Sequence, residues 1–355
     1  MRNRFIPHVE GLRGAAALSV LLGHLYFLMW GYAPFRDLAD HISVLEFGWI
    51  GVSAFIVISG YCLALPIVDG KPFDSLAFAN RRIRRILPAY LVALVFSVPF
   101  LYYGASVSGW WPSSDYVIQR LLVHLLMAQD LVPVPPIRDL DGPMWSVALE
   151  MQIYAVFALA MVPIWKRRSG VSVLLFALVL TLALIFLWPA FPRPWFLILF
   201  AFGILAAEHR APPWLGWALG VAAVAQLAHD GQTLARADLL VGGATAAFLA
   251  SKPGIVTRLL STAPMVGLGR MSYSVYLVHS PLLIAVTATV MRLKPPTAGV
   301  VIYALAVPFI LGVSYLLYRF AERPFLGSAL RTSPVQSAVE KQSVRTHDLA
   351  VEGSQ

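Results

Sequence analysis

Charged residues are scarce in this chain of 355 residues. Only 13% of the residues are charged and 59% are apolar, whereas soluble domains contain about 25% charged and about 45–50% apolar residues. This shortage of charge excludes an ordinary soluble domain. The composition is that of an integral membrane protein.

Cysteine is almost absent too, since Cys62 is the only one in the sequence. An intrachain disulfide and a cysteine-based metal site are therefore excluded. No His and carboxylate residues have the spacing of metal ligands, so we expect no metal. The basic N-terminus lacks a small-residue cleavage site after its first apolar stretch, so we expect that stretch to stay as a span rather than to leave as a signal peptide.

The net charge of +9 comes from basic residues in short clusters between long apolar segments. A nucleic-acid-binding protein would instead gather them on one face. We therefore expect membrane lipids and phosphorylated ligands as partners, and no nucleic acid.

Ten segments are apolar over most of the length of about 20 residues that a membrane span requires. They are residues 12–34, 46–68, 86–104, 142–165, 171–190, 194–208, 213–229, 238–251, 268–291 and 297–319, the sixth and eighth being short. The predicted fold class is all-α, a polytopic integral membrane helical bundle of about ten transmembrane helices. The sequence contains no internal repeat and no second soluble domain, so we predict one membrane domain over residues 1–332.

Lysine and arginine concentrate in alternate connections, among them Lys71, residues 81–85 and residues 166–168. By the positive-inside rule, this asymmetry places both termini in the cytoplasm. From Ser333 onward the chain is polar without periodicity, so residues 333–355 are predicted to be a disordered cytoplasmic tail. The longest non-cytoplasmic connection, residues 104–141, is rich in tryptophan and in proline at 133–136, which suits an interfacial loop or lid with a short helix near residues 116–127.

Ionisable side chains inside spans indicate function, because each costs at least about 3 kcal/mol in lipid. Arg13 and His24 lie eleven positions apart in the first span, on nearly the same helix face and separated by about 16 Å along the axis. His24 is either a helix-packing histidine or a general base, since neutral imidazole accepts a hydroxyl proton near pH 7.

Four arginines and no lysine stand between Asn80 and Pro88, namely Arg81, Arg82, Arg84 and Arg85. The cluster is either a positive-inside anchor or a phosphate site. The choice of arginine favours the second, because guanidinium binds phosphate bidentately while topology requires only charge.

The fourth span begins with a polar group of residues that comprises Trp145, Ser146, Glu150 and Tyr154. Glu150 lies about 10 Å from the non-cytoplasmic end, with Tyr154 one turn later on its face. We expect Glu150 to pair with His24 and hold its imidazole in one tautomer, as the carboxylate of a catalytic triad does. A purely structural ion pair is the alternative.

In the ninth span, Ser272, Tyr276 and His279 share one helix face. They could line the same cavity and position an oxyanion or substrate. Alternatively, their side chains could form hydrogen bonds that hold neighbouring helices together. Glu322 lies between Arg319 and Arg323 and is expected to form a local salt bridge at the membrane surface.

Together these segments resemble the acyltransferase-3 family of bacterial membrane O-acyltransferases. Six motifs occur in the family's order over residues 5–326, and any one of them alone is weak. They are Glu10 to Gly14 with His24, Phe55 to Tyr61, Arg81 to Pro88, Pro143 to Ser146 with Glu150 and Tyr154, Leu268 to Ser274 with His279 to Pro281, and Glu322 to Pro324.

The resemblance implies ten spans, a cytosolic acyl-CoA donor, commonly acetyl-CoA, and an essential arginine and histidine that map onto Arg13 and His24. It implies that Arg81 and Arg84 serve donor binding, to which we add Arg85. The chain has Ala54 before Phe55, where a second aromatic residue is common in the family. We expect it to lack the fused hydrolase-like domain that some members carry.

The predicted function is therefore transfer of an acyl group, commonly acetyl, from acyl-CoA to a hydroxyl of a cell-surface polysaccharide or its lipid-linked precursor at the bacterial inner membrane. Catalytic roles fall to His24, as general base or acyl carrier, and to Glu150. The acceptor is a carbohydrate or glycolipid, with a macrolide or other small molecule as the alternative. A transporter of lipid-linked sugars would show a similar cavity, and the oligomeric state stays open.

Overall fold

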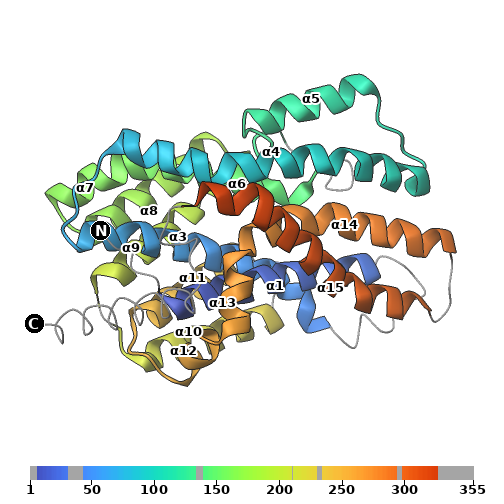
Figure 1. Cartoon of the computed structure of the whole chain (residues 1–355). Coiled ribbons are helices and arrows are strands. Elements are labelled where there is room, and N and C mark those ends of the chain that lie inside the picture. Colours follow the sequence, from blue (N-terminus) through green and yellow to red (C-terminus); the bar gives the residue numbers. More distant parts are fainter. Residues whose placement is uncertain are drawn as a thin grey trace, which may run out of the picture.

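The computed structural model describes residues 6–30, 43–132, 139–209, 211–229, 234–293 and 298–326, and over these ranges the chain is helical without strands (Figure 1). The predicted all-α class is confirmed there. The predicted tail at 333–355 lies outside the described residues. The longer helices are α1 (Pro7–Trp30), α3 (Ile50–Val68), α4 (Ser75–Ser108), α5 (Ser114–Leu125), α6 (Trp145–Val156), α8 (Gly170–Leu187), α9 (Phe196–Glu208), α10 (Pro213–His229), α11 (Leu234–Ala250), α14 (Ser272–Leu293) and α15 (Ala298–Leu317).

Short helices connect or extend these elements. A 3₁₀ helix, Ser43–Trp49, precedes α3, and another, Gly142–Met144, precedes α6. A π-helical stretch, Phe157–Met161, joins α6 to α7 (Val162–Arg167), and α12 (Ile255–Leu260) and α13 (Ala263–Arg270) lead into α14. A second π-helical stretch, Tyr318–Glu322, continues α15 and is followed by a 3₁₀ turn, Arg323–Phe325.

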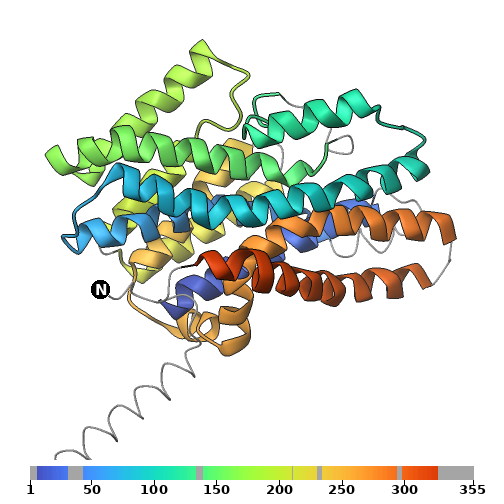
Figure 2. The same cartoon turned by 45° about the horizontal axis from the view of Figure 1, so that its top comes forward.

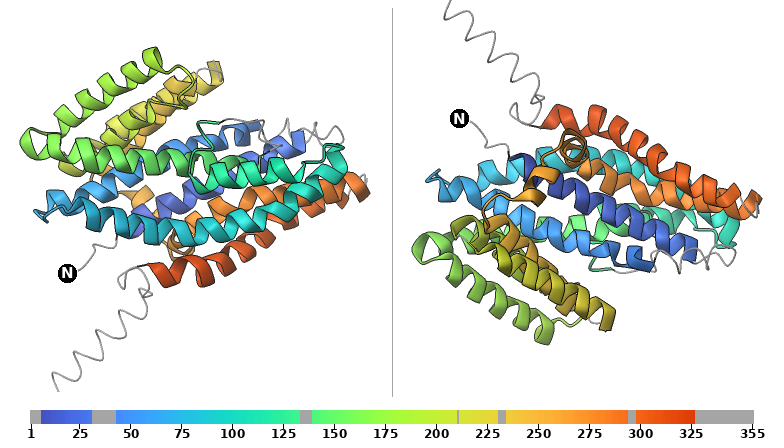
Figure 3. Two further views of the ribbon diagram at one scale, coloured as in Figure 1. Left: turned by 90° about the horizontal axis from the view of Figure 1, so that it is seen from above. Right: turned by 90° about the horizontal axis from the view of Figure 1, so that it is seen from below.

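The first helix lies at the centre of the molecule, packed against α3, α13 and α14, while α4 covers α14 (Figures 1 and 2). Helix α1 carries apolar side chains on several of its faces, and Val20 and Leu21 are among those buried in the core. The peripheral helices α8, α10 and α11 lie on one side of the molecule, and α15 lies on the other (Figure 3).

Two of the sequence motifs meet where α1 and α13 cross. A Cβ atom on Gly269 would collide with the backbone oxygen of Glu10, and one on Gly14 would come within 2.8 Å of the Gly269 nitrogen. Only glycine allows the two backbones to approach so closely. This contact fixes the start of α1, and with it the position of Arg13.

Seven helical segments are long and apolar enough to cross a membrane, among the residues that the structure describes. The protein is therefore a multi-pass membrane protein. Helices also stand at the other three predicted positions, but α9 has 13 residues and α10 and α11 have 17 each. At 1.5 Å per residue, α9 is about 20 Å long, shorter than the hydrocarbon core of about 30 Å.

The arginine cluster lies inside a helix and not in a loop. Asp74 caps the start of α4 by accepting hydrogen bonds from the backbone nitrogens of Leu76 and Ala77. The helix then continues through Pro88 and Pro99 to Ser108. The predicted third span, 86–104, therefore begins about three turns earlier than expected.

The predicted ninth span, 268–291, is interrupted, because α13 ends at Arg270 and α14 begins at Ser272. The predicted short helix in the connection 104–141 is confirmed as α5. The proline-rich stretch 133–136 lies outside the described residues.

Candidate functional site

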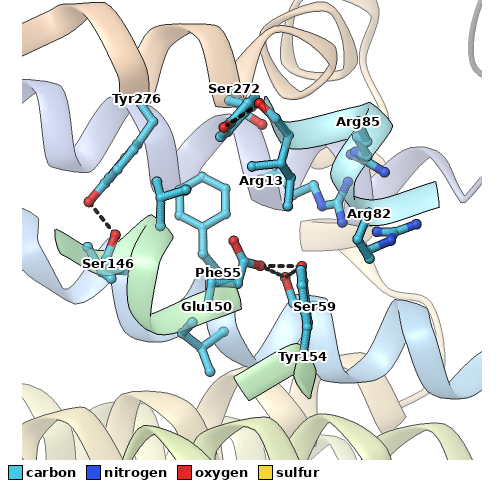
Figure 4. Close-up of a pocket in the computed structure, with 15 residues that line it drawn as sticks. Arg13, Phe55, Ser59, Arg82, Arg85, Ser146, Glu150, Tyr154, Ser272 and Tyr276 are labelled. Atoms are coloured by element: carbon cyan, nitrogen blue, oxygen red, sulfur yellow. Dashed lines mark hydrogen bonds between the residues drawn. The ribbon is translucent and has the colours of Figure 1, made fainter. Parts of the chain in front are cut away.

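A small pocket lies between α1, α3, α4, α6 and α14 (Figure 4). Its volume of about 90 Å³ holds only a few water molecules, which suits an acyl group and the end of an extended arm better than a whole sugar. Among the candidate residues, those that line it are Arg13, Arg85, Glu150, Tyr154, Ser272 and Tyr276.

Positive charge gathers at one end of the pocket. Arg13 of α1 approaches Arg82 and Arg85 of α4 there (Figure 4). The Arg13 guanidinium lies 3.6 Å from the Glu10 carboxylate, and the Arg82 guanidinium stacks over the rings of Phe78 and Tyr154 at 5.8 and 6.0 Å. Such an end can bind a phosphate or another anion.

The arginines of α4 that line the pocket are not the pair that the family motif implied. Arg82 and Arg85 line it, whereas Arg81 and Arg84 are exposed on the other side of α4. Positions 82 and 85 differ by three, so they share a face, and that face packs inward because Phe78 and Ile86 are buried beside them.

Glu150 lies midway along the pocket and is held by two hydroxyl groups. Ser59 Oγ and Tyr154 Oη each donate a hydrogen bond of 2.5 Å to Glu150 Oε1, as Figure 4 shows. The predicted pair of Glu150 with His24 is therefore wrong. His24 instead contacts the Val20 carbonyl oxygen and the His279 ring, and the sequence contains no signal for that arrangement.

Tyr276 closes the opposite end. Its hydroxyl donates to the Pro143 carbonyl oxygen at 2.7 Å and accepts from Ser146 Oγ at 2.6 Å. Its ring lies 6.3 Å from that of Phe55 and 5.6 Å from that of His279, centre to centre. The pocket thus ends one aromatic ring away from His279.

His24 and His279 are in contact with each other, with ring centres 4.9 Å apart and planes inclined at 69°. The structure therefore gives His24 an imidazole neighbour, contributed by α14, in place of the predicted carboxylate. Neither histidine lines the pocket, and the Tyr276 ring lies between the pocket and His279.

The tautomer of both histidines is fixed by the backbone. His24 Nδ1 lies 2.9 Å from the Val20 carbonyl oxygen, and His279 Nδ1 lies 2.7 Å from that of Tyr276. Carbonyl oxygens only accept, so each Nδ1 carries the hydrogen and each Nε2 keeps a lone pair. For His24 this is the tautomer that a general base requires, obtained without a carboxylate.

Trp145 lies outside the pocket in an aromatic cluster around Arg193. The Arg193 guanidinium stacks on the Trp145 ring at 4.8 Å, and Arg193 also forms an ion pair of 3.4 Å with the fully buried Asp238. Trp195 Nε1 donates to the same carboxylate at 2.8 Å. Sequence reasoning missed this group, although Asp238 is a carboxylate at the edge of a predicted span.

A second polar cluster that the sequence did not reveal lies beneath α5. Arg120 donates to the Asp139 carboxylate at 3.0 Å, and His124 Nε2 lies 3.5 Å from the same oxygen. Burial lowers the pKa of His124 and, together with the charge of Asp139, raises the pKa of Asp141. The amphipathic pattern of residues 114–125 could have indicated that Arg120 and His124 point inward.

Glu322 is buried and accepts a hydrogen bond of 2.6 Å from Ser274 Oγ. The predicted surface salt bridge is therefore wrong. Among the residues that the structure describes, no group of three His, Cys, Asp or Glu side chains could hold a metal ion.

Comparison with known proteins agrees with the motifs. A family model described as an acyltransferase domain matches residues 6–319. The O-acetyltransferase OatA of Staphylococcus aureus (strain NCTC 8325 / PS 47) is 22% identical over 90% of this chain and 57% of its own length.

Two further relatives carry related names. A protein of Bacillus subtilis (strain 168) named as the peptidoglycan O-acetyltransferase YrhL is 26% identical over 93% of the chain and 56% of its own length. The membrane-bound transacylase BcsY of Komagataeibacter xylinus is 31% identical over 50% of the chain and 44% of its own length. The chain spans less than two thirds of the length of these relatives, and no solved structure matches it.

Proposed function

Because the chain belongs to the acyltransferase-3 family, we propose that it transfers an acyl group, commonly acetyl, from cytosolic acyl-CoA to a hydroxyl of a cell-surface polysaccharide or of its lipid-linked precursor. One observation carries the proposal, namely that an arginine-lined pocket ends one aromatic ring away from a pair of histidines whose Nε2 atoms keep their lone pairs.

The donor enters at the arginine end. Arg82 and Arg85 hold its phosphates, and Arg13 lies next along the path toward the histidines. From Arg13 to His24 the distance along α1 is about 16 Å, which the extended pantetheine arm of CoA covers. The aromatic side of the pocket, formed by Phe55 and Tyr276, then receives the thioester.

In the general-base route, His24 Nε2 takes the proton of the acceptor hydroxyl while the acceptor oxygen attacks the thioester carbonyl carbon. The carbon–sulfur bond breaks, and the CoA thiolate leaves with the proton that His24 held. The Val20 carbonyl oxygen stabilises the imidazolium between these steps, because it accepts from Nδ1.

In the acyl-carrier route, His24 Nε2 itself attacks the thioester and expels the CoA thiolate. The acceptor oxygen then attacks the acyl-imidazole, and its proton neutralises the thiolate. Tyr276 lies at the closed end of the pocket, and its hydroxyl would stabilise the oxyanion in either route once it exchanged the Pro143 carbonyl oxygen for that acceptor.

Glu150 has a role that does not require contact with His24. Its carboxylate, held by Ser59 and Tyr154, faces the same cavity as Arg13 and Arg82. It therefore balances part of the positive charge of the empty pocket and keeps the side chains in place for the donor.

The acceptor is a carbohydrate or glycolipid on the non-cytoplasmic side of the bacterial inner membrane, with both chain termini in the cytoplasm. Support comes from the names of the relatives, one of which refers to peptidoglycan, and from the asymmetry of basic residues.

The test is CoA release by the full chain in nanodiscs, given acetyl-CoA together with peptidoglycan fragments, crude polysaccharide or a lipid-linked glycan. We expect wild type to release CoA in the presence of one acceptor. His24→Ala should still bind acetyl-CoA but lower kcat by at least about 100-fold, since general-base catalysis contributes about 10²–10⁴-fold.

His209→Ala is the matched control, because His209 is 62% exposed at the end of α9. It should keep wild-type turnover. Labelled acetyl-CoA without acceptor separates the two routes, because only the acyl-carrier route leaves label on the protein. If the protein does not bind acetyl-CoA but moves sugar lipids across the bilayer, the result would contradict the acyltransferase function and favour a transporter.

A further inference from the structure

A second and larger cavity lies on the outside of the bundle, in a groove between α4 and α15 with α14 as its floor. Its volume is about 410 Å³. The lining is apolar apart from one threonine and includes Phe96, Phe100, Leu282, Val286, Ile302 and Phe309. All three helices belong to segments that can cross a membrane, so the groove opens toward lipid chains.

The two helices on either side of the groove diverge from each other. The π-helical continuation of α15, Tyr318–Glu322, contacts α4, and from that end α15 diverges from α4 across α14 (Figures 1 and 2). Its rim stays open, since Phe309 is 57% exposed. An apolar groove with an exposed rim between two diverging helices admits a single hydrocarbon chain from the side.

A positive charge and hydroxyl groups mark the open end. Tyr103 Oη and Thr289 Oγ1, the latter lining the groove, lie 3.0 Å apart. The exposed Arg292 guanidinium stacks on the Tyr103 ring at 4.8 Å and donates to Ser106 Oγ. Among the described residues, no carboxylate lies within ion-pair distance of Arg292, so its charge is available to an anion.

We propose that this groove is a specific site for an anionic phospholipid, with one acyl chain along α14 and the phosphate on Arg292. Apolar side chains hold the chain by burial, and the guanidinium, fixed by Tyr103 and Ser106, forms charge-assisted hydrogen bonds to the phosphate oxygens. A lipid so placed fills the space between α4 and α15 and supports the helix that carries Tyr276 and His279.

The geometry favours a resident phospholipid over a lipid-linked acceptor. Arg292 follows His279 by 13 positions on α14, which is about 20 Å along the axis. A glycan attached to a phosphate at Arg292 would start at the membrane surface, far from the histidine pair. The site therefore does not depend on the proposed acyl transfer.

The experiment is native mass spectrometry of the full chain after reconstitution with phosphatidylglycerol, phosphatidylcholine or diacylglycerol, followed by mild delipidation. We expect wild type to retain one phosphatidylglycerol and to release phosphatidylcholine, which carries no net charge, and diacylglycerol. Arg292→Gln should reduce retention of phosphatidylglycerol about tenfold, the effect of losing one hydrogen-bonded charge.

Arg236→Gln is the matched control, since Arg236 is also an exposed arginine near a helix end, on α11. It should retain phosphatidylglycerol like wild type. Ala285→Phe, which fills the groove from its floor, should release the lipid while the protein stays monodisperse in size-exclusion chromatography. If Ala285→Phe aggregates, Val286→Phe takes its place.

Equal retention by Arg292→Gln and wild type would overturn the proposal, because the headgroup would then contribute nothing. Loss of lipid from the wild type during mild delipidation, or equal retention of phosphatidylcholine or diacylglycerol, would overturn it as well. CoA release plays no part in these readouts, so failure of the acyltransferase function would leave this result unchanged.

Discussion

At the scale of single residues, the helical period decides which arginines face the candidate site. Four arginines occupy positions 81 to 85, and any of them could bind an anion as far as chemistry is concerned. The burial of Phe78 and Ile86 turns one face of α4 inward, and Arg82 and Arg85 belong to that face. Arg81 and Arg84 are exposed on the opposite side of α4.

Substitution of these arginines separates donor binding from topology. We expect Arg82→Gln to raise the KM for acetyl-CoA about tenfold or more, because a hydrogen bond to a charged group contributes about 1.5–3 kcal/mol. The measurement is CoA release at varied acetyl-CoA concentration.

Arg81→Gln removes the same charge from the exposed side of the same turn, and its KM should stay within about twofold of wild type. If Arg81→Gln impairs donor binding and Arg82→Gln does not, the donor uses the outer face of α4, as the family motif implied.

At the scale of elements, close crossings of helices hold the site walls together. Helices α3 and α9 cross at Gly60 and Gly203, where a Cβ atom on either residue would collide with the backbone of the other helix. Helix α3 also carries Ser59, which holds Glu150. The distance between two backbones therefore determines where a pocket carboxylate lies.

Gly203→Ala should destabilise the protein by about 1–3 kcal/mol, the usual cost of overpacking. The obstacle is backbone, with the Tyr61 nitrogen 2.6 Å from the added Cβ, and backbone cannot rotate away as a side chain can. The measurement is the midpoint of thermal unfolding in detergent.

Gly220→Ala in α10 serves as the comparison, because nothing lies within 4 Å of its added Cβ. Alanine favours a helix by about 0.5–1 kcal/mol over glycine, so this variant should unfold at the same or a higher temperature. A Gly203→Ala midpoint equal to wild type would mean that the α3–α9 crossing is looser than described.

At the scale of the whole molecule, α4 is long enough to test how the chain is oriented in the membrane. Its 34 residues extend over about 51 Å, well beyond the hydrocarbon core of about 30 Å. If α4 spans the membrane, its two ends lie on opposite sides. The positive-inside rule places the Asp69 end in the cytoplasm.

Cysteine labelling checks this arrangement in a Cys62→Ala background. Asp69→Cys and Ser114→Cys both introduce an exposed thiol. We expect an impermeant maleimide added to right-side-out membrane vesicles to label only Ser114→Cys. In inverted vesicles the same reagent should label only Asp69→Cys. Labelling of both from the same side would exclude the proposed topology.

The sequence by itself determined the helical class, the positions of the apolar segments and the family motifs. Length, hydropathy and spacing are local properties, so the predicted spans 12–34 and 268–291 overlap the helices α1 and α14 of the structure. For the same reason Arg13, His24, Glu150 and Tyr276 could be recognised as polar residues inside apolar segments. Each of these inferences needed only the residues of a single segment.

Only the tertiary structure decided which of these residues meet. Glu150 joined Ser59, 91 positions away, and His24 joined His279 rather than Glu150. The cluster of Arg120 and His124 with Asp139 likewise depends on how α5 packs. Such partnerships depend on helix crossings and depth in the bundle, which are set by packing between segments far apart in the chain and leave no periodic signal within either segment.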